Sequence, residues 1–523
     1  MNAKTKKIFY ILGIIALTLI ILYFLANFFA KQKLDTVVEK LPDHIVLTYD
    51  SADIDIIQGN VRLINPIFKI KGKTTGKTNL ELQLDQFGIN NFGYWNFLVN
   101  DTISVEAINV IKPSLKYYKD DNATADQGKT SNGKMLKKPI LVEQLNISNG
   151  SVKMINRQTD STVLKTENLD LVLSQIRQAP ESSNSKFPLI FEDIMFQTEN
   201  LVYSLGNFEN LYISSIDIDK LTSKFRGLRL KTKFGQRELS EIIKTERDHF
   251  NVEIKSLVIN NQDLGYKKDS TFYYNSKKIS LNQLNAEIYR DKLVADDKTQ
   301  KAMYSEMLRK LNFDLGVDML ALNNAKIVYK EKTKPENPAG TLVFDNLNAN
   351  ISNLGNIYDK SKRLSVNVNA DFMKTAPIKV DWSFDVSDQT DKFIFEADVG
   401  YLKVDELNQF TKPNERVKLE GELLQTYFTI GGNANVSQID LKTDYEKLDV
   451  IMLKEDGKEK KGLLTGIVNL FVSKNSEDKK GNFRYGYAEE VKRDKTKSIF
   501  NFIWLNVRDG LKSAVTGSGK RKK

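Results

Sequence analysis

The side chains that could carry chemistry in this sequence are few and widely separated. The chain contains only two histidines, His44 and His249, and no cysteine. These two positions are too far apart to suggest a histidine-based triad or a histidine-rich metal site. The lack of cysteine excludes a disulfide framework, a thiolate metal site and a cysteine nucleophile. Aspartates and glutamates are scattered, so no pair of carboxylates is indicated for acid–base catalysis.

One segment resembles a phosphate-binding loop, Gly72-Lys-Thr-Thr-Gly-Lys-Thr78. The segment is one residue too short, because Lys71 stands where the first glycine of such a loop belongs. It also lies between two predicted strands, 67–70 and 80–84, whereas a phosphate-binding loop must lead into a helix. We therefore expect no nucleotide site, no cofactor and no enzymatic activity.

Charge is concentrated at the two ends of the chain. The net charge is +10, and residues 1–33 contain five lysines and no acidic residue. Residues 492–523 contain ten basic and two acidic residues, which leaves the long middle of the chain close to neutral. This distribution argues against nucleic acid as a partner and favours contact with lipid headgroups at either end.

A run of 23 uncharged residues, Ile8 to Ala30, predicts a transmembrane helix. A cleaved signal peptide is the competing interpretation. The run is long for a signal core, and Ala26 and Ala30 lie four residues apart rather than the two expected at a cleavage site. We therefore expect an uncleaved anchor. The lysines before the run favour an N-terminus in the cytoplasm, with the body of the chain outside it.

The body of the chain reads as strands with one apolar face and one polar face. Alternation is clearest over 364–372 and 378–386, followed by Phe393, Phe395, Ala397 and Val399. Such alternation is typical of an antiparallel sheet with one solvated side. The residues expected on the apolar face are Leu364, Val366, Val368, Ile378, Val380, Trp382 and Phe384.

Four segments share a looser pattern of a strand, a small polar turn and a second strand. They are 105–119, 142–156, 252–268 and 316–331, and the Asn149-Gly150 pair in the second is a strong turn signal. We interpret each as a β-hairpin. Hairpins repeated in this way predict an elongated, twisted antiparallel groove with a few short helices.

Helical patterns occur at 237–250, 297–311 and 495–513. The last has an apolar stripe with basic residues opposite, and two interpretations of it remain open. The helix either covers the end of the sheet and buries the stripe, or lies on a membrane surface with its aromatic residues at headgroup depth. The stripe consists of Ile499, Phe500, Ile503, Trp504, Val507 and Leu511.

The chain resembles the AsmA-like family of bacterial envelope proteins in its whole organisation, and most strongly in its closing part. The likeness rests on the N-terminal anchor, on turns such as 147–152, and on closing segments. Those segments are 421–433, 441–450, 490–493, 498–504 and 510–512. The resemblance implies a groove related to that of chorein-type lipid-transfer proteins, in which an apolar concave face holds acyl chains. It brings no catalytic residue with it.

The resemblance implies passive phospholipid transfer by an inner-membrane protein whose body lies in the periplasm, in support of outer-membrane biogenesis or envelope integrity. Its partners would be the inner membrane, a second leaflet contacted through the C-terminal helix, a phospholipid ligand and an envelope protein. The main alternative is a non-enzymatic structural or regulatory envelope protein, with a closed β-sandwich core, that binds a protein partner and carries no lipid. A carbohydrate-active β protein is a third interpretation. The expected regions are 1–33 (anchor), 34–236 (first groove), 237–311 (mixed), 312–486 (second groove) and 487–523 (basic helix and tail).

Overall fold

The computed structural model describes residues 41–55, 58–73, 75–120, 138–178, 189–267, 269–455, 476 and 483–517. The predicted transmembrane run and most of the basic tail lie outside these residues. In the described part of the chain, no helix combines the length and the apolar character that crossing a bilayer requires.

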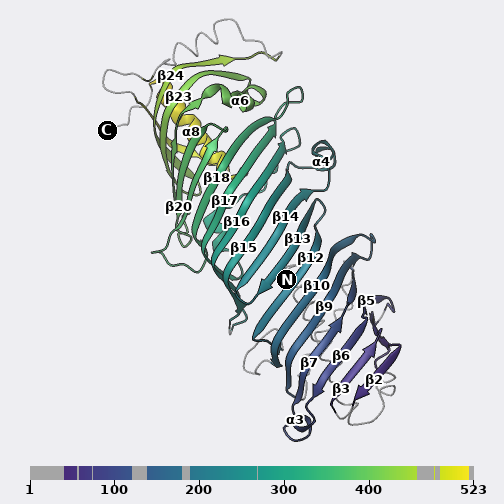
Figure 1. Ribbon diagram of the computed structural model, residues 1–523. Coiled ribbons are helices and arrows are strands. Elements are labelled where there is room, and N and C mark those ends of the chain that lie inside the picture. Colours follow the sequence, from purple (N-terminus) through teal and green to yellow (C-terminus); the bar gives the residue numbers. More distant parts are fainter. Residues whose placement is uncertain are drawn as a thin grey trace. The chain divides into compact units, whose positions relative to one another are not determined.

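The described residues are mainly β, with 62% in strands and 11% in helices, and their 25 strands belong to one large open twisted sheet (Figure 1). Period-two alternation therefore predicted the fold class correctly. Contacts divide the chain into two units. Unit 1 comprises residues 1–205, 211–225 and 266–270, and unit 2 comprises 206–210, 226–265 and 271–523.

The first twelve strands are short at the start of the chain and become longer. They are β1 (Ile45–Thr48), β2 (Ser51–Asp55), β3 (Asn60–Ile64), β4 (Ile67–Lys71), β5 (Thr78–Gln83), β6 (Gln86–Phe92), β7 (Ile103–Ile111), β8 (Ser114–Lys119), β9 (Ile140–Asn156), β10 (Thr162–Gln178), β11 (Leu189–Ile190) and β12 (Asp193–Leu205). The loop-like segment 72–78 connects β4 to β5, and no helix follows it.

Several of the remaining strands exceed 15 residues. They are β13 (Glu209–Asp219), β14 (Thr222–Thr232), β15 (Asp248–Tyr266), β16 (Phe272–Asp291), β17 (Asp314–Lys332), β18 (Gly340–Gly355), β19 (Leu364–Phe372), β20 (Ala376–Phe384), β21 (Phe393–Val399), β22 (Leu402–Lys403), β23 (Val417–Gly432), β24 (Val436–Met452) and β25 (Arg484–Lys492).

The described helices are short, apart from the last. They are α3 (Tyr94–Leu98), α4 (Gln236–Ile242), α5 (Tyr304–Arg309), the 3-10 turn η2 (Val404–Leu407), α6 (Asn408–Glu415) and α8 (Ile499–Thr516). The helix expected over 237–250 stops at Ile242, because Ile243 takes an extended conformation and β15 begins at Asp248.

The four segments interpreted as hairpins are not hairpins, and this prediction was wrong. Segments 142–156, 252–268 and 316–331 lie almost wholly in the single strands β9, β15 and β17. The Asn-rich centre of each contains a residue with positive φ, namely Asn149, Asn261 and Asn324. Asparagine tolerates this left-handed conformation, so the chain bends at a bulge and continues in the same direction.

Segment 105–119 spans β7 and β8, and both of these strands pair with β9 in parallel. β7 and β8 therefore lie end to end along β9, and the break between them falls at Lys112-Pro113. Lys112 has a φ of 49°, and Pro113 has no N–H to donate to the ladder.

The sheet is mixed, which corrects the prediction of an antiparallel sheet. β16 and β17 also pair in parallel, joined by a connection that contains α5. A parallel pair needs such a long crossover, whereas a tight turn enforces an antiparallel pair. The alternation of side chains is the same in both arrangements, so the sequence pattern could not distinguish them.

Candidate functional site

The seven residues expected on the apolar face lie on one side of two neighbouring strands in unit 2. Register places Leu364 opposite Phe384, Val366 opposite Trp382, and Val368 opposite Val380. Ile378, the remaining member, pairs with Ala370. The structure therefore brings all seven together on the β19–β20 hairpin.

The apolar face continues across neighbouring strands as two rows of paired residues. Row A is Ile279, Leu320, Ile351, Val366, Trp382, Phe395, Ile430 and Ile439, from β16 to β24. Row B is Leu281, Leu322, Ala349, Val368, Val380, Ala397, Phe428 and Leu441. No charged or hydrogen-bonding side chain, apart from the Trp382 indole, interrupts either row.

The β16 and β17 members of these rows are not among the seven residues expected on the apolar face. Alternation in Lys278-Ile-Ser-Leu-Asn282 was a usable signal, since it places Ile279 and Leu281 on one side. The parallel pairing of β16 with β17 then puts them beside Leu320 and Leu322, which no local pattern predicts.

Unit 1 contains a comparable pair of rows of its own. Val61, Ile89, Ile108, Leu145, Leu173 and Ile194 are paired in sequence from β3 to β12. Leu63, Phe87, Val110, Ile147, Leu171 and Phe196 form the row beside it. Within each unit, therefore, an apolar path runs across the strands rather than along one of them.

The rows of unit 2 are buried at one end and accessible at the other. Ile430 and Ile439 have no exposed surface and Leu441 is 3% exposed. Ile279, Leu281, Leu320 and Leu322, at the β16 and β17 end, are only partly buried. A sandwich would cover both ends with a second sheet, but the described strands form one open sheet. On β16 and β17 the rows thus form an apolar surface that solvent partly reaches.

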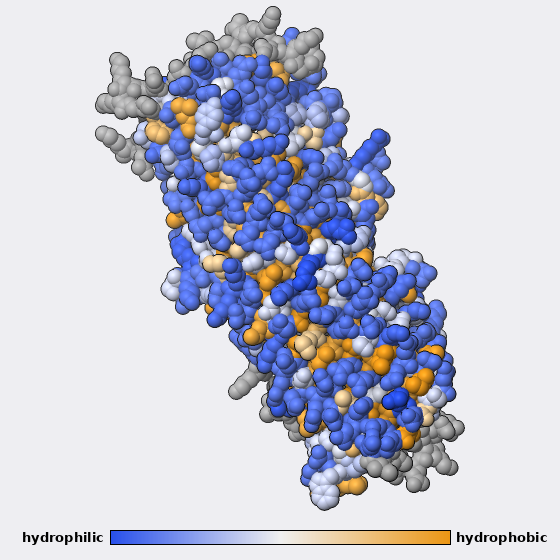
Figure 2. Space-filling model, viewed as in Figure 1, coloured by the Kyte–Doolittle hydropathy of each residue, from blue (hydrophilic) through white to orange (hydrophobic). Residues whose placement is uncertain are grey.

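The opposite side of the same strands is polar. Asn350, Asn367, Asp381, Glu396, Thr429 and Asp440 occupy successive paired positions there. Figure 2 shows a face of the protein on which hydrophilic side chains predominate. A sheet built in this way keeps one face in water and offers the other to apolar material.

Helix α8 covers the buried end of the rows. Ser498 caps its N-terminus by accepting a hydrogen bond from the Asn501 N–H at 3.3 Å, and Gly517 ends it with φ of 69°. Asn506 is fully buried, where its amide donates to Ser437 Oγ of β24 at 2.8 Å. The hydrogen bond to Ser437 fixes the helix on the sheet at a buried polar position.

The apolar stripe of α8 is divided between the sheet and solvent. Ile499 and Ile503 are buried among row residues, and Val507 and Leu511 pack against the same core. These four residues therefore lie as expected for a helix that covers the end of the sheet. Phe500 and Trp504 point outward and are 60% and 48% exposed.

Exposed aromatic and methionine side chains lie on the solvent-facing sides of α5 and α8. The Trp382 ring lies 5.6 Å from Tyr304 and 6.5 Å from Phe500, measured between ring centroids. Tyr304 is 39% exposed and Met307 is 54% exposed. We call Tyr304, Met307, Phe500 and Trp504 the rim patch, because it borders the buried end of the rows.

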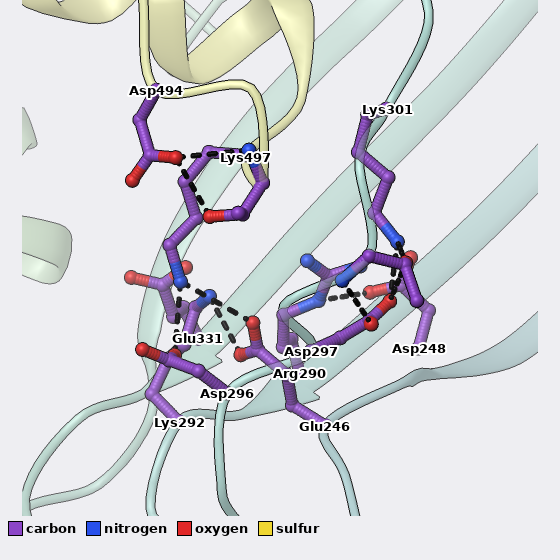
Figure 3. Close-up of polar contacts among 12 residues, drawn as sticks. Glu246, Asp248, Arg290, Lys292, Asp296, Asp297, Lys301, Glu331, Asp494 and Lys497 are labelled. Atoms are coloured by element: carbon purple, nitrogen blue, oxygen red, sulfur yellow. Dashed lines mark hydrogen bonds and ion pairs between the residues drawn. The ribbon is translucent and has the colours of Figure 1, made fainter.

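A cluster of ion pairs holds the turn before α8 (Figure 3). Lys497 Nζ lies 2.9 Å from Asp296 and 3.5 Å from Glu246. Glu246, which is buried, also pairs with Lys292 at 2.6 Å. Beside them, Asp494 accepts hydrogen bonds from the N–H and hydroxyl of Thr496, which shape the turn itself.

The ion pair between Lys497 and Asp296 shifts the pKa of both groups. The hydrogen bond from Lys497 lowers the pKa of Asp296, and the same bond raises the pKa of Lys497. A carboxyl group whose pKa is lowered in the folded state stabilises the fold at pH values above its unfolded-state pKa of about 3.9. That stabilisation is lost as pH falls through the folded-state pKa. The stabilisation contributed by Lys497 is fully present at pH values below its unfolded-state pKa. It is lost as pH rises through the raised pKa of Lys497 in the folded state.

We therefore expect Lys497→Met to lower the midpoint of denaturant unfolding at pH 7, and to have progressively less effect as pH falls through the lowered folded pKa of Asp296. Urea titrations of both proteins across this range measure the difference. Lys512→Met, which removes an exposed lysine near the other end of α8, should show no such dependence. A constant difference between Lys497→Met and wild type at all pH values would contradict the assignment.

Searches with the sequence give no match to a protein-family model and no significant match to a curated protein.

Proposed function

We propose that this protein is a membrane-anchored carrier of phospholipid, with acyl chains lying on apolar rows and headgroups in water. The single observation that supports this most is the accessible end of rows A and B on β16 and β17. Residues 8–30 would hold the chain in the inner membrane, with the sheet in the periplasm, where carriage of lipid would support outer-membrane biogenesis.

The chemistry of the rows suits acyl chains. Each methylene removed from water contributes about 0.8 kcal/mol, and similar aliphatic side chains follow one another at the spacing of strands. A chain can therefore move from one strand to the next without leaving apolar surroundings. No step requires a nucleophile, a metal or a cofactor, so the transfer we propose is passive.

Site-specific photo-crosslinking tests this function. A photoreactive phenylalanine analogue at Leu322, in row B, should form adducts with phospholipid in intact cells, detectable by mass spectrometry. The matched control is Asn323, the next residue, which is exposed on the polar side. Absence of a lipid adduct at Leu322, or equal adducts at both positions, would reject the proposal.

A second candidate function is binding of an envelope protein without lipid carriage. The rim patch supports it, because exposed tryptophan, tyrosine and methionine are enriched at protein interfaces. In the same crosslinking experiment, this function predicts protein adducts at Met307 and no lipid adduct at Leu322.

A further inference from the structure

Helix α3 presents an exposed apolar surface at one end of the strands of unit 1. It lies between β6 and β7, and Figure 1 shows it projecting past the end of β7. Trp95, Leu98 and Val99 are 74%, 76% and 56% exposed. We call these three residues the α3 tip. Figure 2 shows pale and orange side chains at this end of the protein.

The α3 tip is held on a fixed base. Tyr94 and Phe97 face inward and pack against the apolar core of unit 1. The ring of Phe92 lies 5.4 Å from Tyr94 and 5.6 Å from Phe97. Asn96 donates to Ser104 Oγ at 2.9 Å, and this bond ties the helix to β7. The exposed side chains are therefore presented by an anchored turn.

Charged side chains lie beside the α3 tip, and the turn that carries the tip contains none. Residues 93–100 contain no charged side chain. Lys138 flanks the turn, with its ammonium 3.9 Å from the centre of the Phe97 ring and 2.7 Å from Asp101. An apolar projection that carries an exposed tryptophan and is bordered by a lysine matches the chemistry of a membrane interface, where aromatic rings and lysines lie at headgroup depth.

We infer that the α3 tip inserts into the lipid bilayer as a second membrane contact, separate from the predicted span at residues 8–30. A stable protein partner would need an interface of about 800 Å² on each side, far more than three side chains supply. A bilayer needs no such area, because each exposed side chain can enter the interface independently.

The directions of β1 and β2 show at which end of these strands the α3 tip lies. Ile45, at the start of β1, pairs with Ile70, whereas Asp55, at the end of β2, pairs with Asn60. Gly59, next to Asn60, accepts a hydrogen bond from Phe92 at the base of α3. β1 and β2 thus run toward the α3 tip, which lies at the end of these strands where β2 turns into β3.

The test uses the full chain in nanodiscs of phosphatidylethanolamine and phosphatidylglycerol. The protein has no cysteine, so Leu98→Cys provides a single site for an environment-sensitive fluorophore. We expect a nitroxide-labelled phosphatidylcholine in the bilayer to quench this probe by about half or more, as a side chain at interfacial depth requires. Adding Trp95→Ser and Val99→Ser should reduce the quenching.

Gln158→Cys is the matched control. It is exposed in the turn between β9 and β10, at the other end of β9, roughly 50 Å of strand away from the α3 end. Its probe should be quenched little. Equal quenching at both sites, or none at position 98, would overturn the inference. Circular dichroism of each labelled variant confirms that folding is retained.

Discussion

Gly486→Val is expected to displace helix α8 from the sheet and lower the free energy of unfolding of unit 2 by about 3 kcal/mol. Gly486 of β25 faces the helix backbone directly. A Cβ atom there would lie 2.0 Å from the Gly510 carbonyl oxygen and 3.0 Å from Ala514. Neither is the flexible end of a side chain, so the helix itself must move.

Loss of α8 would uncover residues that are now sealed, above all Phe502, Ile439 and Ile430. Limited proteolysis should therefore cut the variant within α8 under conditions in which the wild type resists, and urea titration should measure the destabilisation. Gly431→Ala is the control, since nothing lies within 4 Å of the Cβ that it adds. If Gly486→Val keeps a protected α8, then contact between the two backbones does not determine how the helix docks.

Val368→Asp should reduce phospholipid bound to the protein at least about tenfold, because a carboxylate on row B must lose its water when an acyl chain covers it. Val368 lies between Ala349 and Val380 in the row and is only partly buried. The charge can therefore remain hydrated when no lipid is present. Folding should be largely retained, with lipid content measured by extraction and mass spectrometry.

Asn369→Asp is the control for charge alone. It adds the same carboxylate one residue further along β19, on the exposed polar side. Lipid content should remain at the wild-type level in this variant. If Val368→Asp instead unfolds the protein as severely as Trp382→Asp, the row is part of a filled core, and the partner-binding function gains support.

The distinction between Val368→Asp and Trp382→Asp follows from how deeply each side chain is buried, because the two residues lie on neighbouring strands. Trp382 is 8% exposed and touches the rings of Tyr304, Phe384, Phe395 and Phe500. Removing it would leave a cavity among these rings, with a cost of about 3–5 kcal/mol. The covered end of the rows therefore stabilises unit 2, and the accessible end is the part available to a ligand.

Much of the architecture could be predicted because period-two alternation is a local property. Side chains of successive strand residues point to opposite faces, so the sequence alone placed Leu364, Val366 and Val368 together. The uncharged run at 8–30 and the absence of cysteine likewise required no folded context. The membrane span and lipid carriage stay predictions.

Only the tertiary structure decided where strands turn, which strands become neighbours and what covers the apolar face. Asn149 can adopt its left-handed conformation in a turn or in a bulge, and pairing with β10 on both sides of it selects the bulge. The parallel β16–β17 pair and the seat of α8 against Gly486 join residues distant in sequence. Such contacts depend on packing between elements, which a local pattern does not encode.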